Sequence, residues 1–456
     1  MKRLTLSTVA GWCGGSLVGE DREFDRISLD SRDVDESTLF VAVRGERFDA
    51  HDFIGSVAEK NASGAVVERR AVTENPGMPV IFVNDTRKAL LDIARNYRLL
   101  LGVKVIGLTG SVGKTTTKEM TYCVVSKTLN AIKTQGNLNN EIGLPKTVFT
   151  LDESHNGAVI EMGMSHFGEI SALSKTALPD IGIITNIGVS HIENLGSRDG
   201  ILKAKLEILD GMKKGSTLVL NMDNDKLCDV SLPDYRILGF GIDNAKAEVR
   251  ATDIKQTQDS TSFTVEFFGK AQAVTLPTVG LHNVYDALAA FCVGLELETE
   301  PSVIADALSE YTPSGMRQRI KKADGITVIE DCYNASPDSQ KAAINALVSF
   351  SGKRKIAVLG DMLELGDYSE TAHRQIGKYA AEKKLDAVFT YGEMSRLIAE
   401  EASKGNVKSF AFTDKAELFK ALNSYLEKDD VVLFKASRGM KLEEIIEMLY
   451  EEWKIK

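Results

Sequence analysis

The sequence predicts an α/β protein built from three domains. A chain of 456 residues is too long for one ordinary core, and roughly three domains are expected for this length. A glycine-rich turn connects an apolar strand at 103–109 to a helix that begins with Lys114, and after Pro313 strand-like and helix-like stretches alternate regularly. Such alternation is typical of parallel sheets covered by helices.

The first block, residues 1–85, mixes short strand patterns with short helical ones. Its apolar runs LFVAV, GAVVE and PVIFV have the length and β-branched content of buried strands. We expect a mixed α/β domain here, followed by a helix in TRKALLDIARNYRLL.

The second block, residues 86–312, has the pattern of a nucleotide-binding α/β domain. Buried strands are predicted in VKVIGLT, GAVIEMG, IGIITNIG and STLVLNMD. Residues 246–279 alternate polar and apolar side chains, which predicts antiparallel strands, and the helix NVYDALAAFCVGL closes the block.

The third block, residues 313–456, predicts a Rossmann-like, doubly wound sheet. The strands ITVIEDC, KIAVLGD, DAVFTYG and VVLFKAS are separated by helical stretches. His373 falls in one of these helices, and we expect it to be an ordinary surface histidine.

Charge and cysteine content exclude several classes of function. The formal net charge of -10 argues against a nucleic-acid-binding surface, which needs a basic face. The five cysteines form no CxxC pair, as expected for reduced thiols in a cytoplasmic protein. No segment approaches the ~18 apolar residues of a membrane span, so we expect no membrane partner.

The glycine-rich turn predicts a phosphate-binding loop. Glycines allow successive backbone N–H groups to point at phosphate oxygens, and the helix N-terminus adds a positive dipole end. Lys114 should reach the β- and γ-phosphates of a nucleotide, and Thr115 should ligate Mg²⁺. The motif is shortened, because Leu108 stands where the general pattern has its first glycine. The predicted nucleotide-binding residues are Gly110, Ser111, Val112, Gly113, Lys114, Thr115 and Thr116.

A phosphate-binding loop alone does not distinguish an enzyme from a switch. A guanine-nucleotide switch needs an Asn-Lys-x-Asp motif, and the stretch at 223–226 reads Asp-Asn-Asp-Lys instead. A switch-type GTPase is therefore disfavoured. An NTP-driven binding switch without ligation remains an alternative from another functional class.

Several further stretches resemble the Mur ligase family in the family's order and along nearly the whole chain. They are LDSRDVDESTLFVAVRGERFDAHDF, TGSVGKTT, GNLNNEIGLP, EMGMSHFGEI, NIGVSHIENLGS, AKLEI, GLHNVYDALAA, EDCYNASPDS and GDMLELG. The resemblance implies an ATP-dependent ligase that works through an acyl phosphate. The YNASPDS and GNLNNEIG spellings, together with the absence of DNPR, imply addition of D-alanyl-D-alanine to UDP-N-acetylmuramoyl-tripeptide in peptidoglycan synthesis. A sister Mur ligase or a folylpolyglutamate-type ligase is the nearest alternative, and a monomer is expected.

Catalytic and metal-binding residues are expected at the ends of the central strands. Glu161 ends the strand GAVIE, where a carboxylate faces the nucleotide crevice and can hold Mg²⁺. The resemblance implies that His191 binds a second Mg²⁺. It also implies that Lys205 is carbamylated by CO₂, as a neutral, desolvated lysine amine can be. Lys203 is the competing lysine.

Other nucleotide contacts are implied on both sides of the second domain boundary. Asn283 matches the residue of the family that contacts adenine, although an asparagine at a helix start can simply be a cap. Asp331 ends the strand ITVIED, where an aspartate can bind ribose hydroxyls. Arg317 matches the family's interdomain arginine near the ATP phosphates, with Arg319 as a close competitor.

Substrate contacts are expected in all three blocks. Ser31 and Arg32, next to Asp30, can clamp a diphosphate or uracil group. The resemblance implies that this stretch binds the uridine diphosphate end of the substrate. The resemblance implies dipeptide contacts in the segment 361–366. The remaining candidates are Asn137, Asn139 and Asn140 for the muramoyl portion, and Tyr333 and Asn334 for the dipeptide.

Overall fold

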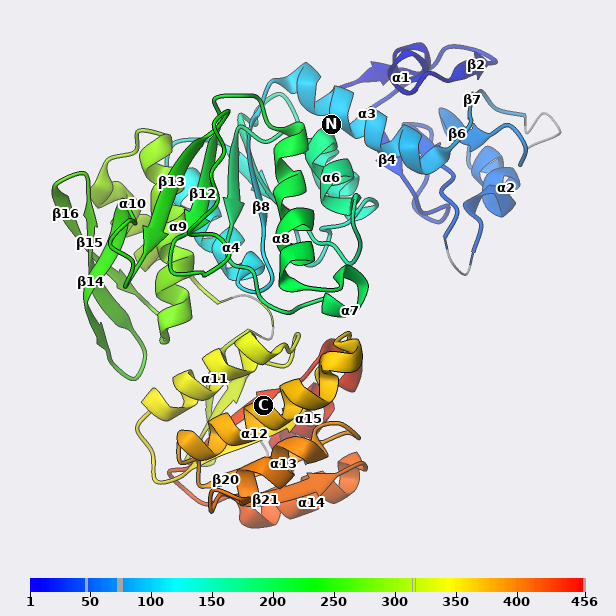
Figure 1. Ribbon diagram of the computed structural model, residues 1–456. Coiled ribbons are helices and arrows are strands. Elements are labelled where there is room, and N and C mark those ends of the chain that lie inside the picture. Colours follow the sequence, from blue (N-terminus) through cyan, green and yellow to red (C-terminus); the bar gives the residue numbers. More distant parts are fainter. Residues whose placement is uncertain (46–47, 72–76, 314, 316, 454–456) are drawn as a thin grey trace.

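The computed structural model describes residues 1–45, 48–71, 77–313, 315 and 317–453. It has an α/β fold with three bodies arranged along the chain, each containing one large sheet (Figure 1). The N-terminal body lies beside the central body, and the C-terminal body lies below it in this view. The fold class predicted from the sequence is confirmed.

The N-terminal body contains a five-stranded sheet in the order β2-β7-β6-β5-β4 and a two-stranded ribbon, β1-β3. The strands LFVAV, GAVVE and PVIFV of the prediction are β5, β6 and β7, which pair in parallel at the centre of this sheet. The elements are β1 (Leu4–Thr5), α1 (Leu6–Cys13), β2 (Ser16–Val18), β3 (Glu23–Phe24), β4 (Arg26–Ser28), β5 (Thr38–Val41), α2 (Ile54–Glu59), β6 (Gly64–Glu68) and β7 (Val80–Val83).

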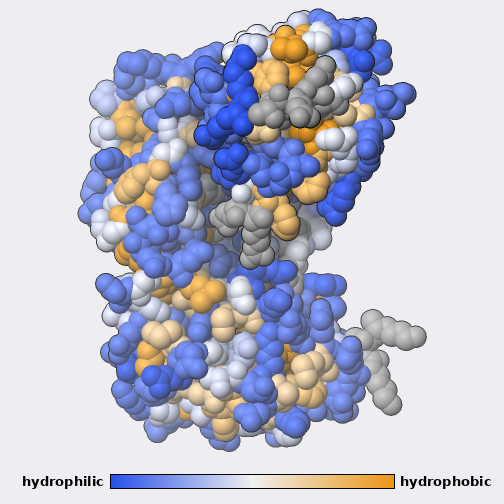
Figure 2. All heavy atoms as spheres, turned by 90° about the vertical axis from the view of Figure 1, so that its right-hand side faces the viewer, coloured by the Kyte–Doolittle hydropathy of each residue, from blue (hydrophilic) through white to orange (hydrophobic). Residues whose placement is uncertain are grey.

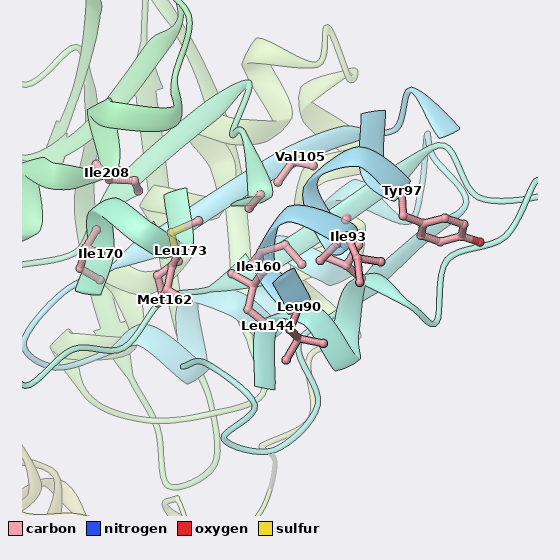
Figure 3. Packing of buried hydrophobic residues seen from close by; sticks show 14 of the residues in the cluster. Leu90, Ile93, Tyr97, Val105, Leu144, Ile160, Met162, Ile170, Leu173 and Ile208 are labelled. Carbon is pink, nitrogen blue, oxygen red and sulfur yellow. The ribbon is translucent and has the colours of Figure 1, made fainter. Parts of the chain in front are cut away.

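Helix α3 (Thr86–Leu101) connects the N-terminal and central bodies. The Asp85 side chain caps it by accepting hydrogen bonds from Arg87 N and Lys88 N, and Gly102 ends it in the left-handed conformation. Its apolar face packs against the central sheet and its helices, and Leu90, Ile93 and Tyr97 point into this core (Figure 3). Residues of both bodies thus belong to one continuous hydrophobic cluster.

The central body is built on a nine-stranded sheet in the order β16-β15-β14-β13-β12-β11-β8-β10-β9. Strands β8 to β14 run parallel, and β15 and β16 continue the sheet antiparallel, as the alternation at 246–279 predicted. The strands are β8 (Lys104–Thr109), β9 (Ala131–Lys133), β10 (Gly157–Glu161), β11 (Ile181–Ile184), β12 (Thr217–Asn221), β13 (Arg236–Gly241), β14 (Val249–Gln256), β15 (Thr261–Phe267) and β16 (Lys270–Leu276).

Helices cover both faces of the central sheet, because neighbouring strand residues point to opposite sides. Residues of α3, α6 and α8 share one hydrophobic cluster with the sheet, and residues of α4, α9 and α10 share the other. The helices are α4 (Lys114–Val125), α5 (Gly143–Val148), α6 (Glu169–Ala177), α7 (Ile192–Leu195), α8 (Arg198–Leu206), α9 (Leu281–Glu296) and α10 (Pro301–Ser309).

The C-terminal body is doubly wound. Its sheet has the order β17-β18-β22-β19-β20-β21, in which only the β17-β18 pair is antiparallel. Helices α11, α12 and α13 pack on one face and α14 and α15 on the other. The strands are β17 (Arg319–Ala323), β18 (Ile326–Glu330), β19 (Lys355–Gly360), β20 (Ala387–Tyr391), β21 (Lys408–Phe412) and β22 (Val431–Lys435). The helices are α11 (Pro337–Ser349), α12 (Ser369–Glu382), α13 (Arg396–Ser403), α14 (Lys415–Tyr425) and α15 (Glu443–Glu452).

The face of the molecule that Figure 2 shows is mostly hydrophilic, with hydrophobic residues in small groups. Within the described residues, no helix combines the length and the hydrophobicity that crossing a lipid bilayer requires.

Candidate active site

The shortened glycine-rich turn forms a phosphate-binding loop between β8 and α4. Gly110 and Gly113 both have positive φ, of 158° and 83°, and a Cβ on Gly110 would lie 1.8 Å from Thr185 Oγ1. Any larger residue at position 110 would therefore clash with the end of β11. Lys114 starts the helix and donates a 2.9 Å hydrogen bond from Nζ to Gly110 O, so its side chain curls back over the loop.

The side chain of Asn186 occupies the mouth of this loop. Its Oδ1 accepts hydrogen bonds from Ser111 N at 3.0 Å and from Val112 N at 2.9 Å. Backbone N–H groups of such a loop are the donors that bind phosphate oxygens. Asn186 therefore holds two of these donors in an orientation that converges on one acceptor.

Glu161 and Thr115 meet at the carboxyl ends of adjacent parallel strands. Glu161 ends β10 and is almost fully buried, and its two oxygens accept hydrogen bonds from Thr115 Oγ1 at 3.0 Å and from Asn139 Nδ2 at 2.9 Å. A hydroxyl and a carboxylate beside the phosphate loop are oxygen ligands that suit Mg²⁺, with the nucleotide and water completing its shell. No group of three or more His, Cys, Asp or Glu suited to metal binding occurs in the described parts of the chain. The donor set thus fits a nucleotide-bound Mg²⁺ rather than a metal held by protein alone.

His191 does not join this pair. It caps α7 with a positive φ of 62°, and its Nδ1 lies 2.8 Å from Glu364 Oε2 of the C-terminal body, at an ion-pair distance but without hydrogen-bond geometry. The contact lowers the pKa of the Glu364 carboxyl. The residue predicted to bind a second Mg²⁺ is thus engaged across the domain interface.

Two lysines of the central body lie in surroundings that disfavour their charge. Lys205 on α8 is 2% exposed, and burial together with the charge of Lys114 lowers its pKa well below the usual value. Burial also lowers the pKa of Lys114, while Glu161 opposes that effect. Lys203, the competitor of Lys205, is exposed and lies over the ring of Phe167. Of the two lysines, only Lys205 thus has a buried amine whose neutral form is favoured, as carbamylation requires.

A cavity of about 210 Å³ lies between the central and C-terminal bodies. The phosphate loop forms one wall, and the ends of β18 and β22 form the opposite wall. The predicted residues Asn283, Arg317, Asp331, Tyr333 and Asn334 all line it, together with every residue from Ser111 to Thr116. The cavity therefore unites predicted nucleotide contacts that lie more than 200 positions apart in the sequence.

Arg317 rather than Arg319 reaches the cavity. Its guanidinium stacks over the ring of Tyr333 at 4.3 Å, and its charge acts on the pKa values of Lys114 and Asp286. Arg319 belongs to β17 and is exposed, at 3.8 Å from Glu330. Tyr333, expected at the dipeptide site, thus packs against an arginine that lines this cavity.

Asp331 and Asn283 are both held by protein partners. Asp331 Oδ2 accepts a 2.6 Å hydrogen bond from the buried Lys435, which keeps a carboxylate oriented at the strand end. Asn283 donates from Nδ2 to Val279 O at 2.7 Å and to Gln318 Oε1 at 2.9 Å. Its Oδ1 accepts no hydrogen bond from the described residues, which leaves an acceptor suited to an adenine amino group.

The substrate residues predicted in the first block lie outside this cavity. Arg32 is largely exposed and makes a bidentate pair with Asp30, and the pair lowers the pKa of that carboxyl strongly. Asp30 also lines a second cavity, of about 440 Å³, together with Lys146 of the central body. Ser31 is half-buried, and its carbonyl accepts a hydrogen bond from Lys60.

The three asparagines after β9 have three different positions. Asn139 reaches Glu161, as described above. Asn140 Oδ1 accepts hydrogen bonds from Ile142 N and Gly143 N at the start of α5, which is the geometry of a turn or cap. Asn137 is exposed. Only Asn139 is therefore brought to the phosphate side of the site.

Three residues of the site were not singled out in the sequence. Asn186 lies two residues after β11 and Lys435 ends β22. The apolar patterns of both strands were recognised, so positions at the crevice edge were the available signal. Asp286 lies on α9, three residues after Asn283, and is buried in the cavity wall. A lone acidic residue in an otherwise apolar helical stretch was the signal there.

Three family models match the chain, in chain order. They are described as the Mur ligase family catalytic domain over residues 23–98, the Mur ligase middle domain over 108–294, and the Mur ligase glutamate ligase domain over 316–438.

Curated relatives and solved structures match over almost the full length. The UDP-N-acetylmuramoyl-tripeptide–D-alanyl-D-alanine ligase of Bacillus subtilis is 41% identical over 458 residues, covering 99% of both chains, and that of Escherichia coli is 34% identical with the same coverage. A crystal structure of MurF from Acinetobacter baumannii superimposes with a TM-score of 0.92 at 32% identity, covering 99% of both chains. MurF of Thermotoga maritima in complex with ADP gives a TM-score of 0.85 at 31% identity, covering 94% of this chain and 98% of that one.

Proposed function

The chain belongs to the Mur ligase family, and from this premise we propose that it joins D-alanyl-D-alanine to UDP-N-acetylmuramoyl-tripeptide. The reaction consumes ATP, proceeds through an acyl phosphate, releases ADP and phosphate, and serves peptidoglycan precursor synthesis. Relatives named for this activity match over almost the whole chain, that of Bacillus subtilis at 41% identity and that of Escherichia coli at 34%, and a MurF structure with ADP bound has the same fold.

The observation that carries the proposal is the cavity between the central and C-terminal bodies. It combines a phosphate loop that starts at Gly110 with charged groups from a second domain, Arg317 and the Asp331–Lys435 pair. A ligase of this kind needs both halves, because the acyl phosphate must be formed on one side and attacked from the other in a site that excludes water.

We assign the phosphoryl-transfer step to charges and positioning, with no enzyme nucleophile. Lys114 and Arg317 stabilise the negative charge that develops as the substrate carboxylate attacks the γ-phosphate. The N–H groups of Ser111 and Val112 bind phosphate oxygens, with Asn186 moving aside or sharing them. Asp331 orients the ribose and Asn283 the adenine ring.

We further propose that Thr115 and Glu161 hold Mg²⁺ and that Lys205 is carbamylated. When bound, Mg²⁺ neutralises charge on the transferring phosphate and orients it. Carbamylation replaces a buried amine with a carboxylate-like anion, which would relieve the repulsion between Lys205 and Lys114. A second Mg²⁺ at His191 requires that residue to exchange its contact with Glu364 for the metal.

The remaining assignments rest on the sequence resemblance and on placement. We propose domain boundaries at 85 and 312, just before α3 and after α10. Ser31 and Arg32 bind the uridine diphosphate end, Asn137, Asn139 and Asn140 the muramoyl portion, and Tyr333 and Asn334 the dipeptide. We propose a monomer in the cytoplasm, consistent with five cysteines that are all free.

The test is a ligation assay with ATP, Mg²⁺, UDP-N-acetylmuramoyl-tripeptide and D-alanyl-D-alanine, read by the mass of the pentapeptide product. Wild type should form it, and Lys114→Ala should not. Substitution of the nucleotide-sugar by folate or by shorter muramoyl peptides separates this activity from those of sister ligases. ATP hydrolysis that is independent of any acceptor amine would instead support an ATP-driven switch.

A further inference from the structure

The segment at residues 361–366 follows β19 and reaches the central body. The neighbouring strand order β18-β22-β19 places it two strands away from the end of β18, which lines the nucleotide cavity. Glu364 at its tip has a positive φ of 63° and lies 2.8 Å from His191. Close by, a Cβ on Gly366 would lie 3.0 Å from Glu193 Cγ, so the segment packs tightly against α7.

His373 fixes the backbone of this segment from within the C-terminal body. It lies on α12, it is 0% exposed, and its Nε2 accepts a 3.0 Å hydrogen bond from Met362 N. Its Nδ1 lies 2.7 Å from Ser369 O. The expectation of a surface histidine is therefore wrong, because helix α12 turns this residue toward the sheet.

These two contacts permit only one form of the imidazole ring. A carbonyl oxygen can only accept, so Nδ1 must carry the hydrogen, and a backbone N–H can only donate, so Nε2 must be unprotonated. Burial lowers the pKa of His373, which favours this neutral ring, although Asp361 opposes the effect. The ring thus serves as a fixed link between α12 and the segment.

Other contacts fix the base of the segment, whereas the Glu364 carboxylate at its tip is exposed and contacts His191. Leu363 N donates to Ser437 Oγ at 3.0 Å and Asp361 Oδ1 accepts from Ser395 N at 2.6 Å, so its base is held at three points. The Glu364 side chain remains 60% exposed beside the domain interface. An exposed carboxylate held at a fixed position is suited to a cationic amine.

We propose that His373 is a positioning residue for the amine-bearing substrate: it holds the segment 361–366 so that Glu364 presents its carboxylate to the incoming dipeptide ammonium. This inference rests on the proposed function. The nucleotide cavity is bounded by the ends of β18 and β22, and none of the residues 361–366 is among its lining residues. The segment extends from the end of β19, the next strand along the sheet, so an amine held by Glu364 would approach the acyl group from this side.

The test compares two substitutions of His373, one that keeps an acceptor for Met362 N and one that removes it. In His373→Gln the side-chain oxygen can still accept from Met362 N, whereas His373→Leu leaves that N–H without a partner. We expect His373→Leu to raise the KM for D-alanyl-D-alanine about tenfold or more while the KM for ATP stays within about twofold of wild type, and His373→Gln to restore most of the loss. Equal increases in both KM values, or a His373→Leu enzyme with wild-type kinetics, would overturn the proposal.

Glu364→Ala keeps the proposal testable if His373→Leu does not fold, since Glu364 is exposed. It should raise the KM for the dipeptide selectively, and an unchanged value would refute the proposed role of the segment. Where both variants fold, the fold-increase in the dipeptide KM of the double variant should be smaller than the product of the two single increases, because both substitutions act through one segment. A wild-type enzyme that forms no pentapeptide would reject the proposed function, whereas an active wild type with unaffected variants rejects only this inference.

Discussion

Thr117 donates a 2.7 Å hydrogen bond from its hydroxyl to Oδ1 of Asp286, joining the first turn of α4 to the middle of the cavity wall. The same oxygen lies 2.6 Å from the position of a Cβ on Gly113, so the carboxyl packs directly behind the phosphate loop. A charged carboxylate at this point would repel the phosphates that the loop is built to bind. Burial, opposed in part by Thr117 and Arg317, raises the pKa of Asp286 to about 7.

This pKa predicts how Asp286→Asn changes stability with pH. In the unfolded chain the carboxyl ionises above its ordinary pKa of 3.8, whereas the folded protein resists ionisation until about 7. As the pH rises through that interval, the wild-type protein therefore loses stability progressively, whereas Asp286→Asn does not. The free energy of unfolding of Asp286→Asn, relative to wild type, should rise by up to about 4 kcal/mol between about pH 4 and pH 8.

Urea denaturation of both proteins over this pH range, without nucleotide, measures the difference. The exposed Asp199, which pairs with Lys226 at the surface, gives the control variant Asp199→Asn. Stability curves of Asp286→Asn and wild type that run parallel with pH would contradict the prediction.

The fold was largely predictable because its parallel strands are apolar on both faces. The runs that became β8, β10, β11 and β12 lie in the interior of the central sheet, where periodicity and composition agree. The position of His373 was not predictable in the same way. Its helix is amphipathic and mostly polar in sequence. The buried imidazole is satisfied by Ser369 O of the same helix and by the N–H of Met362, and only tertiary packing brings Met362 close.

The hydrogen bonds of Asn186 predict that nucleotide binding tolerates a neutral residue at position 186 better than a charged one. Asn186→Ala frees the N–H groups of Ser111 and Val112 but loosens the loop, so nucleotide affinity should fall about tenfold. Asn186→Asp places a negative charge where phosphate must bind, and the loss should reach about a hundredfold or more. Calorimetric titration with ADP measures both.

Asn224→Ala is the matched control for these variants, because Asn224 donates to Ile187 O close to the same strand end without touching the loop. It should bind ADP like wild type. Equal affinity of the alanine and aspartate variants of position 186 would show that its side chain is not close to the bound phosphates.

Glu161→Gln tests the proposed magnesium site. Loss of the negative charge should raise the Mg²⁺ concentration for half-maximal ligation about tenfold or more, while binding of metal-free ADP changes little. Glu119→Gln is a close control, since Glu119 pairs with Lys118 and Lys133 but does not contact Thr115. If Glu161→Gln and Glu119→Gln both reached half-maximal ligation at the same Mg²⁺ concentration as wild type, Glu161 would be excluded as a ligand.

The placement of candidate-site residues was predictable where a single strand end or loop holds them, and less so where two separate elements meet. Lys114, Thr115 and Glu161 follow directly from the order of strand, loop and helix. The partnership of His191 with Glu364 joins segments more than 170 positions apart, and no local pattern indicates it. Such contacts arise only from the docking of the C-terminal body.

The buried amine of Lys205 predicts that ligation activity depends on CO₂. Lys205 is buried, and burial and the nearby Lys114 lower its pKa well below the usual value, which favours the neutral amine that reacts with CO₂. Ligation in carefully degassed, bicarbonate-free buffer should fall several-fold and recover on addition of bicarbonate, as the carbamate forms again.

Lys205→Met should abolish ligation yet keep or raise the unfolding temperature, because it removes a buried amine that is costly to charge. Lys203→Met, at the exposed competitor, should remain active and keep the response to bicarbonate. Activity of Lys205→Met, or a response to bicarbonate in that variant, would rule out the carbamate.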